Sequence, residues 1–350
     1  MQASAPDIWQ RKNWLGKLLG LGIAVAGLFL LNLSLGSVAI PPGQVAKILL
    51  GLEAGQEAWH HIIWEFRLPK ALTALLAGSA LACSGLQMQT LFRNPLAGPF
   101  VLGISSGASL GVALVVMAGS LLGGWLLADV QGLIILAATI GSASVLLLVV
   151  LVSMKVRDGM TLLIIGLMFG SLASAVVSIL QFFSEAEQIQ AYLIWTFGSL
   201  GGTTREELRL LLPIVLAGLL LAQFLAKPLN ALLLGERYAE SMGVSLKKSR
   251  FLIILSTSLL AGSVTAYCGP IAFVGLAVPH LSRLLFPTAD HRKLLPAVMF
   301  GGAILLLACD ILAQLPGSEK VLPINAVTSL LGAPVVIWLI VRRRNISKSF

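Results

Sequence analysis

The chain has 350 residues, of which 57% are hydrophobic and only 11% are charged, and its mean hydropathy is +0.93. A soluble domain carries about 25% charged residues, so this composition excludes an ordinary water-soluble protein and indicates a chain built for a bilayer. The formal net charge of +9 does not indicate a nucleic-acid partner, because the basic residues are spread along the chain and form no single patch.

Apolar stretches long enough to cross a hydrocarbon core of about 30 Å recur along the whole sequence. We predict an all-α integral membrane protein with about ten transmembrane helices in one polytopic domain, residues 1–350. The predicted spans are residues 16–36, 68–90, 100–118, 131–153, 160–183, 206–226, 250–268, 270–286, 294–313 and 323–341. With the N-terminus inside, most lysines and arginines fall on the inner side, which predicts that both termini are cytoplasmic.

The first apolar run follows basic residues and therefore resembles a secretory signal. It continues from Leu18 to Leu35, whereas the apolar part of a signal peptide is about 7 to 15 residues long. We therefore expect a retained first span.

The second span opens with the sequence RLPK, residues 67–70. Pro69 suits the first turn of a helix, where its missing N–H is not needed, so we expect the helix to begin here. On pattern alone the two cations extend along the apolar surface to the lipid headgroups. His60, His61 and Glu65 precede them on the outer side, where a metal or haem contact and an ordinary surface loop are both open.

Small residues recur at steps of four in two of the spans. The first set is Gly103, Gly107 and Gly111, and the second is Gly166, Gly170, Ser174 and Ser178. Such stripes allow helices to approach closely in a membrane, and we expect this of the first set. For the second set, helix packing is again the expectation from pattern alone.

Residues 186–202 contain only about eleven helix-compatible residues, which reach about 16 Å at 1.5 Å per residue. This is about half a membrane, so we predict a short outer helix that does not span. Tyr192 and Trp195 within it suit an interfacial position.

Residues 228–246 are rich in charge and must lie outside the hydrocarbon, on the cytoplasmic side. Leu234, Tyr238 and Met242 recur every four residues and share one face of a predicted short helix. Gly243 is predicted to end this helix as a left-handed cap. The segment is either a solvated connector or a helix that docks on a soluble partner.

The cysteines Cys83, Cys268 and Cys309 all lie in apolar segments, so we expect free thiols and no disulfides. No P-loop pattern occurs, so energy for transport must come from a partner or from an ion gradient. An ion-coupled carrier would use Asp310 and Glu65, and a membrane-embedded enzyme would have only His280 and Asp310. For His280 we favour a structural hydrogen bond.

Five stretches resemble one known family in order and spacing. They are RLPKALTALLAGSALACSGLQMQTLFRNPLAGPFVLGISSGASLG from Arg67, LGERYAESMGV from Leu234, GPIAFVGLAVPHLSRLL from Gly269, DHRKLLP from Asp290 and LPINAVTSLLGAP from Leu322. The chain resembles the membrane permease subunit of type II ABC importers for iron-siderophores, haem and cobalamin. The resemblance implies a homodimer around a central translocation pathway in the bacterial inner membrane, with two ATP-binding subunits inside and a periplasmic solute-binding protein outside. It implies no catalytic residue, metal or cofactor in this chain.

The resemblance also implies roles for particular residues. The coupling segment, residues 228–246, would dock on the ATPase through Leu234, Gly235, Glu236, Tyr238, Ala239, Met242 and Gly243. The binding protein would dock on Arg67 and Lys70, and residues 186–202 would form an outer gating helix. The pathway would be lined by Gly166, Gly170, Ser174, Ser178, Asn325 and Thr328, with Gly332 on the same face of the last span. The chain departs from the family pattern where Lys70 and Gln314 replace common arginines.

Overall fold

The protein is described by a computed structural model that covers residues 8–52, 56–118, 130–153, 159–315 and 320–342. The remaining residues, which include part of the basic C-terminal tail, lie outside the described ranges.

Within those ranges the chain is helical and contains no strand. The helices are α1 (Ile8–Ser34), α2 (Pro42–Leu49), α3 (Glu57–His61), η1 (Ile62–Arg67), α4 (Leu68–Leu91), η2 (Pro99–Leu102), α5 (Ile104–Ala118), α6 (Val130–Ser153), α7 (Gly159–Phe183), α8 (Ala186–Thr196), α9 (Arg205–Phe224), α10 (Ala226–Leu233), α11 (Glu236–Ser241), α12 (Leu246–Cys268), α13 (Val274–Leu285), α14 (His291–Ala313) and α15 (Ile324–Arg342).

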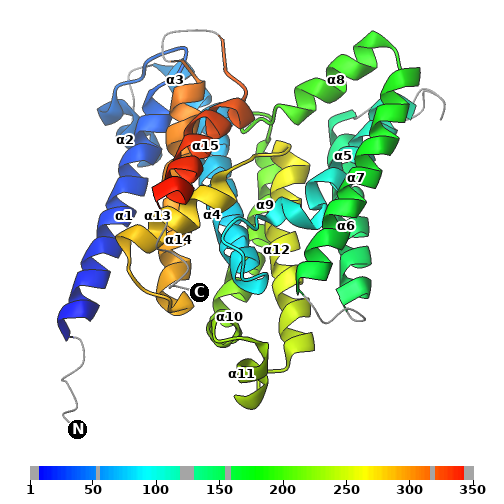
Figure 1. The fold of residues 1–350 in the computed structure, drawn as a ribbon. Helices are drawn as coiled ribbons and strands as arrows, with labels where there is room; N and C mark the ends of the chain where they lie inside the picture. The colour runs from blue at the N-terminus through cyan, green and yellow to red at the C-terminus, as the bar shows by residue number, and fades with distance from the viewer. Residues whose placement is uncertain (1–7, 53–55, 119–129, 154–158, 316–319, 343–350) are drawn as a thin grey trace.

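The helices form one bundle with two distinct ends (Figure 1). Helices α5, α6 and α7 stand on one side, α1, α13, α14 and α15 on the other, and α4, α9 and α12 lie between them. The short helices α10 and α11 lie at the same end as the start of α1, whereas α2, α3 and α8 lie at the opposite end. We call these the inner end and the outer end of the bundle.

Each of the ten predicted spans contains a helix, but three of the helices are short. Within the described residues, seven helices are long and apolar enough to cross a membrane. The shorter ones are α5, α13 and the apolar part of α15. Helix α5 begins only after Gly103, whose φ is +77°, and α13 begins only after the non-helical residues 269–273, where Gly269 has φ +72°. The predicted third and eighth spans therefore began too early, and the number ten stays a prediction.

The second span begins where the sequence placed it, because α4 starts at Leu68 with Pro69 in its first turn. The sequence did not predict the helical residues that precede it. Helix runs without a break from Glu57 to Leu91, over 35 residues, and Pro69 lies inside this run. The six residues directly before α4 form η1, which is π-helical. A π-turn shifts the register of the backbone hydrogen bonds, which is how a helix accommodates a residue that cannot donate one. His60 and His61 consequently lie on a helix, where a loop was one expectation.

Helix α4 is the centre of the bundle, and nearly all of its residues are buried. It packs against α14, α12, α13 and α9. At its crossing with α14 the two backbones touch, because a Cβ added to Gly78 would lie 2.2 Å from the carbonyl oxygen of Gly302. Close backbone contact of this kind is a main source of helix association in lipid.

The first predicted glycine stripe packs helices together, as expected. A Cβ on Gly107 would lie 2.5 Å from the carbonyl oxygen of Gly141, and one on Gly111 would lie 2.1 Å from that of Ala137. Glycine at these positions lets α5 lie directly on α6. The prediction for the cysteines is also confirmed, since all three are buried free thiols.

Candidate functional site

The short helix α11 at the inner end begins and ends at glycines with left-handed backbone angles. Gly235 has φ +104° and Gly243 has φ +80°. The backbone N–H of Gly243 donates to the carbonyl of Glu240, and that of Val244 donates to the carbonyl of Ala239. These two bonds form the glycine cap that the sequence predicted, and they satisfy carbonyls at the end of the helix.

The faces of α11 differ in burial. Tyr238 on α11 and Met242 at its C-cap are 62% and 59% exposed, whereas Ala239 is fully buried. Leu234 is 61% exposed but lies at the end of α10, before the non-helical Gly235, so it does not share the face of α11 that its spacing predicted. We call these three exposed residues the apolar row. Glu236 forms an ion pair with Arg250 at the start of α12, which fixes the helix against the bundle. Large apolar side chains gathered on an exposed surface typically mark an interaction site.

Arg67 was predicted as a cation at the outer surface, and the structure places it elsewhere. Its guanidinium is buried and donates hydrogen bonds to the carbonyls of Leu33, Ser34 and Val38 at the end of α1. The last carbonyls of a helix have no partner within it, and Arg67 supplies one. Arg67 therefore does not extend to the lipid headgroups, which was the expectation from pattern alone.

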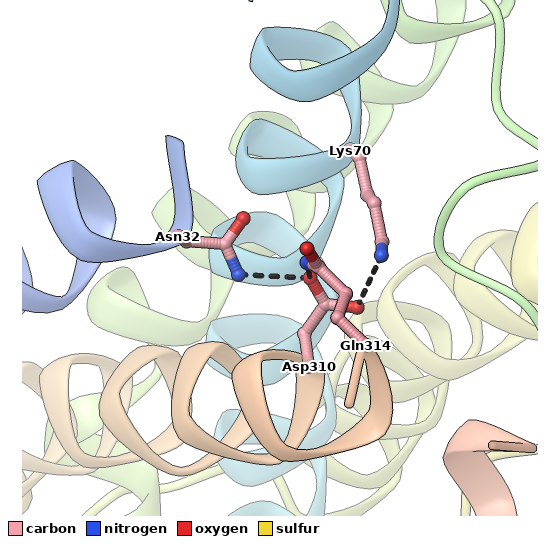
Figure 2. Close-up of polar contacts among 4 residues, drawn as sticks. All are labelled: Asn32, Lys70, Asp310 and Gln314. Atoms are coloured by element: carbon pink, nitrogen blue, oxygen red, sulfur yellow. Dashed lines mark hydrogen bonds and ion pairs between the residues drawn. The ribbon is translucent and has the colours of Figure 1, made fainter. Parts of the chain in front are cut away.

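Lys70 is held in a buried polar network that joins three helices (Figure 2). Its Nζ lies 3.1 Å from Oδ1 of Asp310 on α14, and the two side chains are 17% and 3% exposed. The other carboxylate oxygen accepts hydrogen bonds of 2.8 Å from Asn32 on α1 and Gln314 on α14. We call Asn32, Lys70, Asp310 and Gln314 the outer network. To contact a partner, Arg67 would have to give up its hydrogen bonds to the carbonyls of Leu33 and Ser34, and Lys70 would have to give up its ion pair with Asp310. The docking role of both residues stays a prediction.

The histidines considered for a metal or haem contact lie beside an open hollow at the outer end. Its volume is about 350 Å³, and it is lined by Glu57, His60, His61, Trp64, Glu65 and Arg205. Arg205 pairs with Glu65 at 2.9 Å, and its guanidinium lies over the ring of Trp64. Among the described residues, no three His, Cys, Asp or Glu side chains are grouped as a metal site would require.

The predicted short outer helix is α8, which has 11 residues. Tyr192 is buried, and its hydroxyl lies 2.6 Å from that of Ser109 on α5, whereas its interfacial depth stays a prediction. Its ring packs near that of the half-buried Trp195. Helix α8 is thus attached to α5 by a polar contact, and its gating role stays a prediction.

The second small-residue stripe divides into two halves. A Cβ on Gly166 would lie 2.7 Å from the carbonyl oxygen of Val101, and one on Gly170 would lie 3.2 Å from Oγ of Ser106. These two glycines pack against η2 and α5, and their pathway role stays a prediction. Ser174 and Ser178, one and two turns further along α7, are exposed and can line a pathway.

The predicted face of α15 points mainly into the protein. The side-chain oxygen of Asn325 accepts a hydrogen bond of 3.0 Å from the backbone N–H of Ala272. Thr328 is buried, and a Cβ on Gly332 would lie 2.4 Å from Cβ of Phe273. This face therefore supports the irregular chain before α13, and the pathway roles of Asn325 and Thr328 stay predictions.

His280 has the structural hydrogen bond expected of it. Its Nε2 lies 2.9 Å from the carbonyl oxygen of Pro95, in the turn that follows α4. The ring consequently holds this turn against α13.

The family to which the chain belongs is decided by comparison with known proteins. A model described as the FecCD transport family matches residues 23–342. The chain belongs to the FecCD transport family. The FecCD match covers all ten predicted spans except the first few residues of the first, so the resemblance stated from the motifs is confirmed.

Relatives of this FecCD chain carry matching descriptions. The vitamin B12 import system permease protein of Klebsiella pneumoniae is 38% identical over 331 residues, which is 93% of this chain and 94% of that protein. The hemin transport system permease protein of Yersinia pestis is 37% identical over 318 residues, 91% of this chain and 94% of that protein. A solved inward-facing metal-chelate type ABC transporter matches with a TM-score of 0.80 and 31% identity over 93% of this chain and 99% of that one. The chain is accordingly a multi-pass membrane permease.

Proposed function

We propose that this chain is the permease subunit of an ATP-driven importer in the bacterial inner membrane. Two copies enclose a central pathway, two ATP-binding subunits dock at the inner end, and a periplasmic solute-binding protein docks at the outer end. The cargo is a bulky metal chelate: a ferric siderophore, haem or cobalamin. The FecCD membership and the permease relatives support this proposal.

The observation that carries the proposal is the exposure of three large apolar side chains on and beside α11, the apolar row. The row lies at the end of the bundle where the N-terminal helix begins (Figure 1) and is outside the apolar spans. A solvated connector has no need of Leu234, Tyr238 and Met242 on one surface, and a soluble partner would bury them. Because the chain contains no P-loop, the partner that this surface fits is one that binds ATP.

The alternative is a secondary transporter driven by an ion gradient. Such a carrier needs a carboxylate that can exchange its proton or ion during the cycle. Asp310 is bonded to Lys70, Asn32 and Gln314, and Glu65 is paired with Arg205. Both candidate carboxylates are therefore already engaged, which favours the ATP-driven mechanism.

The energy source gives the first testable prediction. The purified chain alone should hydrolyse no ATP, and proteoliposomes that contain it with its ATP-binding subunit should take up solute only with ATP at the inner side. Uptake should persist when ionophores collapse the proton and sodium gradients. The measurement is radiolabelled solute uptake. Gradient-driven uptake without ATP would overturn the proposal.

The second prediction concerns α11. Tyr238→Glu and Met242→Glu should weaken binding of the ATP-binding subunit by about tenfold each, because each puts a charge into a surface expected to be desolvated. Binding is measured by biolayer interferometry on detergent-solubilised chain. The control is Lys247→Glu, which changes charge at an exposed position on α12 outside the row. Equal binding by all three variants and the unmodified chain would make α11 a connector.

A further inference from the structure

A second buried polar cluster lies at the inner end, where α10, α14 and α4 meet. Asn230 on α10 donates through its side-chain nitrogen to Oδ1 of Asp290 at 2.7 Å. Its side-chain oxygen lies 2.8 Å from both the backbone nitrogen and Nδ1 of His291, the first residue of α14. Nε2 of His291 lies 2.8 Å from the hydroxyl of Thr90 near the end of α4, and both His291 and Thr90 are buried. We call Thr90, Asn230, Asp290 and His291 the inner network.

The orientation of these groups follows from what each can donate. The backbone N–H of His291 is a donor, so the Asn230 atom that faces it is the amide oxygen, and the amide nitrogen faces Asp290. An amide oxygen only accepts, so the ring proton that points toward it lies on Nδ1. In neutral imidazole Nε2 is then an acceptor, so the single proton of the Thr90 hydroxyl is donated either to Nε2 or to the Leu86 carbonyl, which lies 2.9 Å away.

Asp290 provides a charged acceptor for the Asn230 amide. Burial raises the pKa of the Asp290 carboxyl, but hydrogen bonds from Asn230 and the Arg292 backbone, with the charges of Arg292 and Lys293, outweigh it. The pKa therefore lies below its ordinary value, and the carboxyl is ionised at neutral pH. A hydrogen bond to a charged group is stronger than one between neutral groups.

Helix α10 carries α11 directly. Only Leu234 and Gly235 separate the two helices, and α10 and α11 pack against each other. We call residues 226–243 the arm. Asn230 lies in the middle of α10, between the buried side chains of Leu229 and Leu232. A displacement of α11 consequently acts on the bundle through α10.

The other side of the inner network is a pair of helices fixed together along their length. Helices α4 and α14 are joined at the outer end by Lys70 and Asp310, at their crossing by Gly78 and Gly302, and at the inner end by Thr90 and His291. Contacts at three levels leave little freedom for one helix to slide on the other. The pair can therefore move as one rigid body from the inner end to the outer end.

We propose that Asn230 and His291 are positioning residues that join the α10–α11 arm to the rigid α4–α14 pair. This inference rests on the proposed function, because it requires α11 to be displaced by an ATP-binding partner. The apolar contacts of Leu229 and Leu232 can slide, since they have no preferred direction, whereas hydrogen bonds in a buried site are directional and costly to leave unmade. The inner network thus transmits movement of the arm to α4 and α14, and through them to the outer end.

Thr90→Val tests the joint with little change of shape. The variant removes the hydroxyl that faces His291, and it also removes a bond of that hydroxyl to the Leu86 carbonyl in its own helix. The matched control is Thr265→Val, because the buried hydroxyl of Thr265 bonds the Ala261 carbonyl in its own helix. Thr90→Ser restores the hydroxyl. The readouts are solute imported per ATP hydrolysed, affinity for the ATP-binding subunit and the melting temperature.

We expect Thr90→Val to lower the solute imported per ATP by about fivefold, the effect of losing one buried hydrogen bond. Affinity for the ATP-binding subunit should be unchanged, the melting temperature should match that of Thr265→Val, and Thr90→Ser should recover the ratio. If Thr90→Val does not accumulate, Asn230→Ala at the half-buried position on α10 is measured in the same way.

A transport ratio as high in Thr90→Val, or in Asn230→Ala, as in Thr265→Val would overturn the inference and leave the inner network a packing feature. Failure of the proposed function would be recognised by a different result, obtained on the unmodified complex. If the unmodified complex imports no solute with ATP, the proposed function fails and the inference falls with it.

Discussion

Asp310→Ala is expected to destabilise the folded chain by about 3 kcal/mol, the lower part of the range for breaking a buried ion pair. The variant leaves the Lys70 ammonium largely enclosed without its counter-charge, and it removes the acceptor of Asn32 and Gln314. The lower part of the range applies because Lys70 is 17% exposed and can turn partly toward water. The measurement is the unfolding free energy from titration with SDS in mixed micelles.

The chain supplies a control for this experiment in a second ion pair at the outer end. Arg205 and Glu65 lie 2.9 Å apart but are 45% and 40% exposed, so Glu65→Ala should cost only about 0 to 1 kcal/mol. Replacing both partners of the buried pair, as in Lys70→Met with Asp310→Leu, should recover part of the loss because no unpaired charge remains. If Asp310→Ala and Glu65→Ala cost the same, the outer network does not stabilise the junction of α1, α4 and α14.

Gly78→Ala is expected to destabilise the bundle by about 3 kcal/mol, even though alanine is the better helix former by about 1 kcal/mol. The new methyl group would lie 2.2 Å from the carbonyl oxygen of Gly302, and a backbone atom in a packed helix cannot move aside. The two helices would have to separate, which would also stretch the contacts of Lys70 and Thr90 with α14. We expect a lower midpoint in the same SDS titration.

The matched variant is Gly27→Ala in α1. Gly27 is exposed and a Cβ there would meet no atom within 4 Å, so alanine should leave stability unchanged or raise it slightly. The two substitutions are chemically identical and are therefore expected to have opposite signs. A neutral Gly78→Ala would show that α4 and α14 do not touch at this crossing.

The features that the sequence predicted well are those that depend on neighbours in the chain. The positions of the long spans follow from the length of each apolar run, and the end of α11 follows from a glycine placed after one helical turn. The eleven-residue length of α8 follows from the glycines beyond it. In each case the physical cause lies within one or two turns of the residue concerned.

The features that the sequence did not predict depend on distant partners. The pattern RLPK is the same whether its cations face lipid, a protein partner or the interior, and the groups that bind them come from α1 and α14. One pattern in the sequence could have predicted the ion pair between Lys70 and Asp310. Asp310 and Lys70 both lie near the outer end of a predicted span, and a carboxylate within a span normally requires a cation at the same depth.

The sequence also could not predict that the small-residue stripe on α7 is divided into a covered half and an exposed half, for a related reason. Steps of four place Gly166, Gly170, Ser174 and Ser178 on one face, but periodicity does not say which part of that face another segment covers. Helix η2 covers Gly166 and the first turn of α5 covers Gly170, whereas the serines stay exposed. The position of such a segment is set by tertiary contacts and not by local pattern.

The burial of the three cysteines has a practical consequence for spectroscopy. Cys83, Cys268 and Cys309 are all of the cysteines in the sequence, and none is more than 2% exposed. A maleimide or nitroxide reagent therefore meets no accessible native thiol on the folded chain. One cysteine introduced at Ser178 or Tyr238, both exposed, would carry a single label, so distances across the complex could be followed through the transport cycle without first removing the native sulfur atoms.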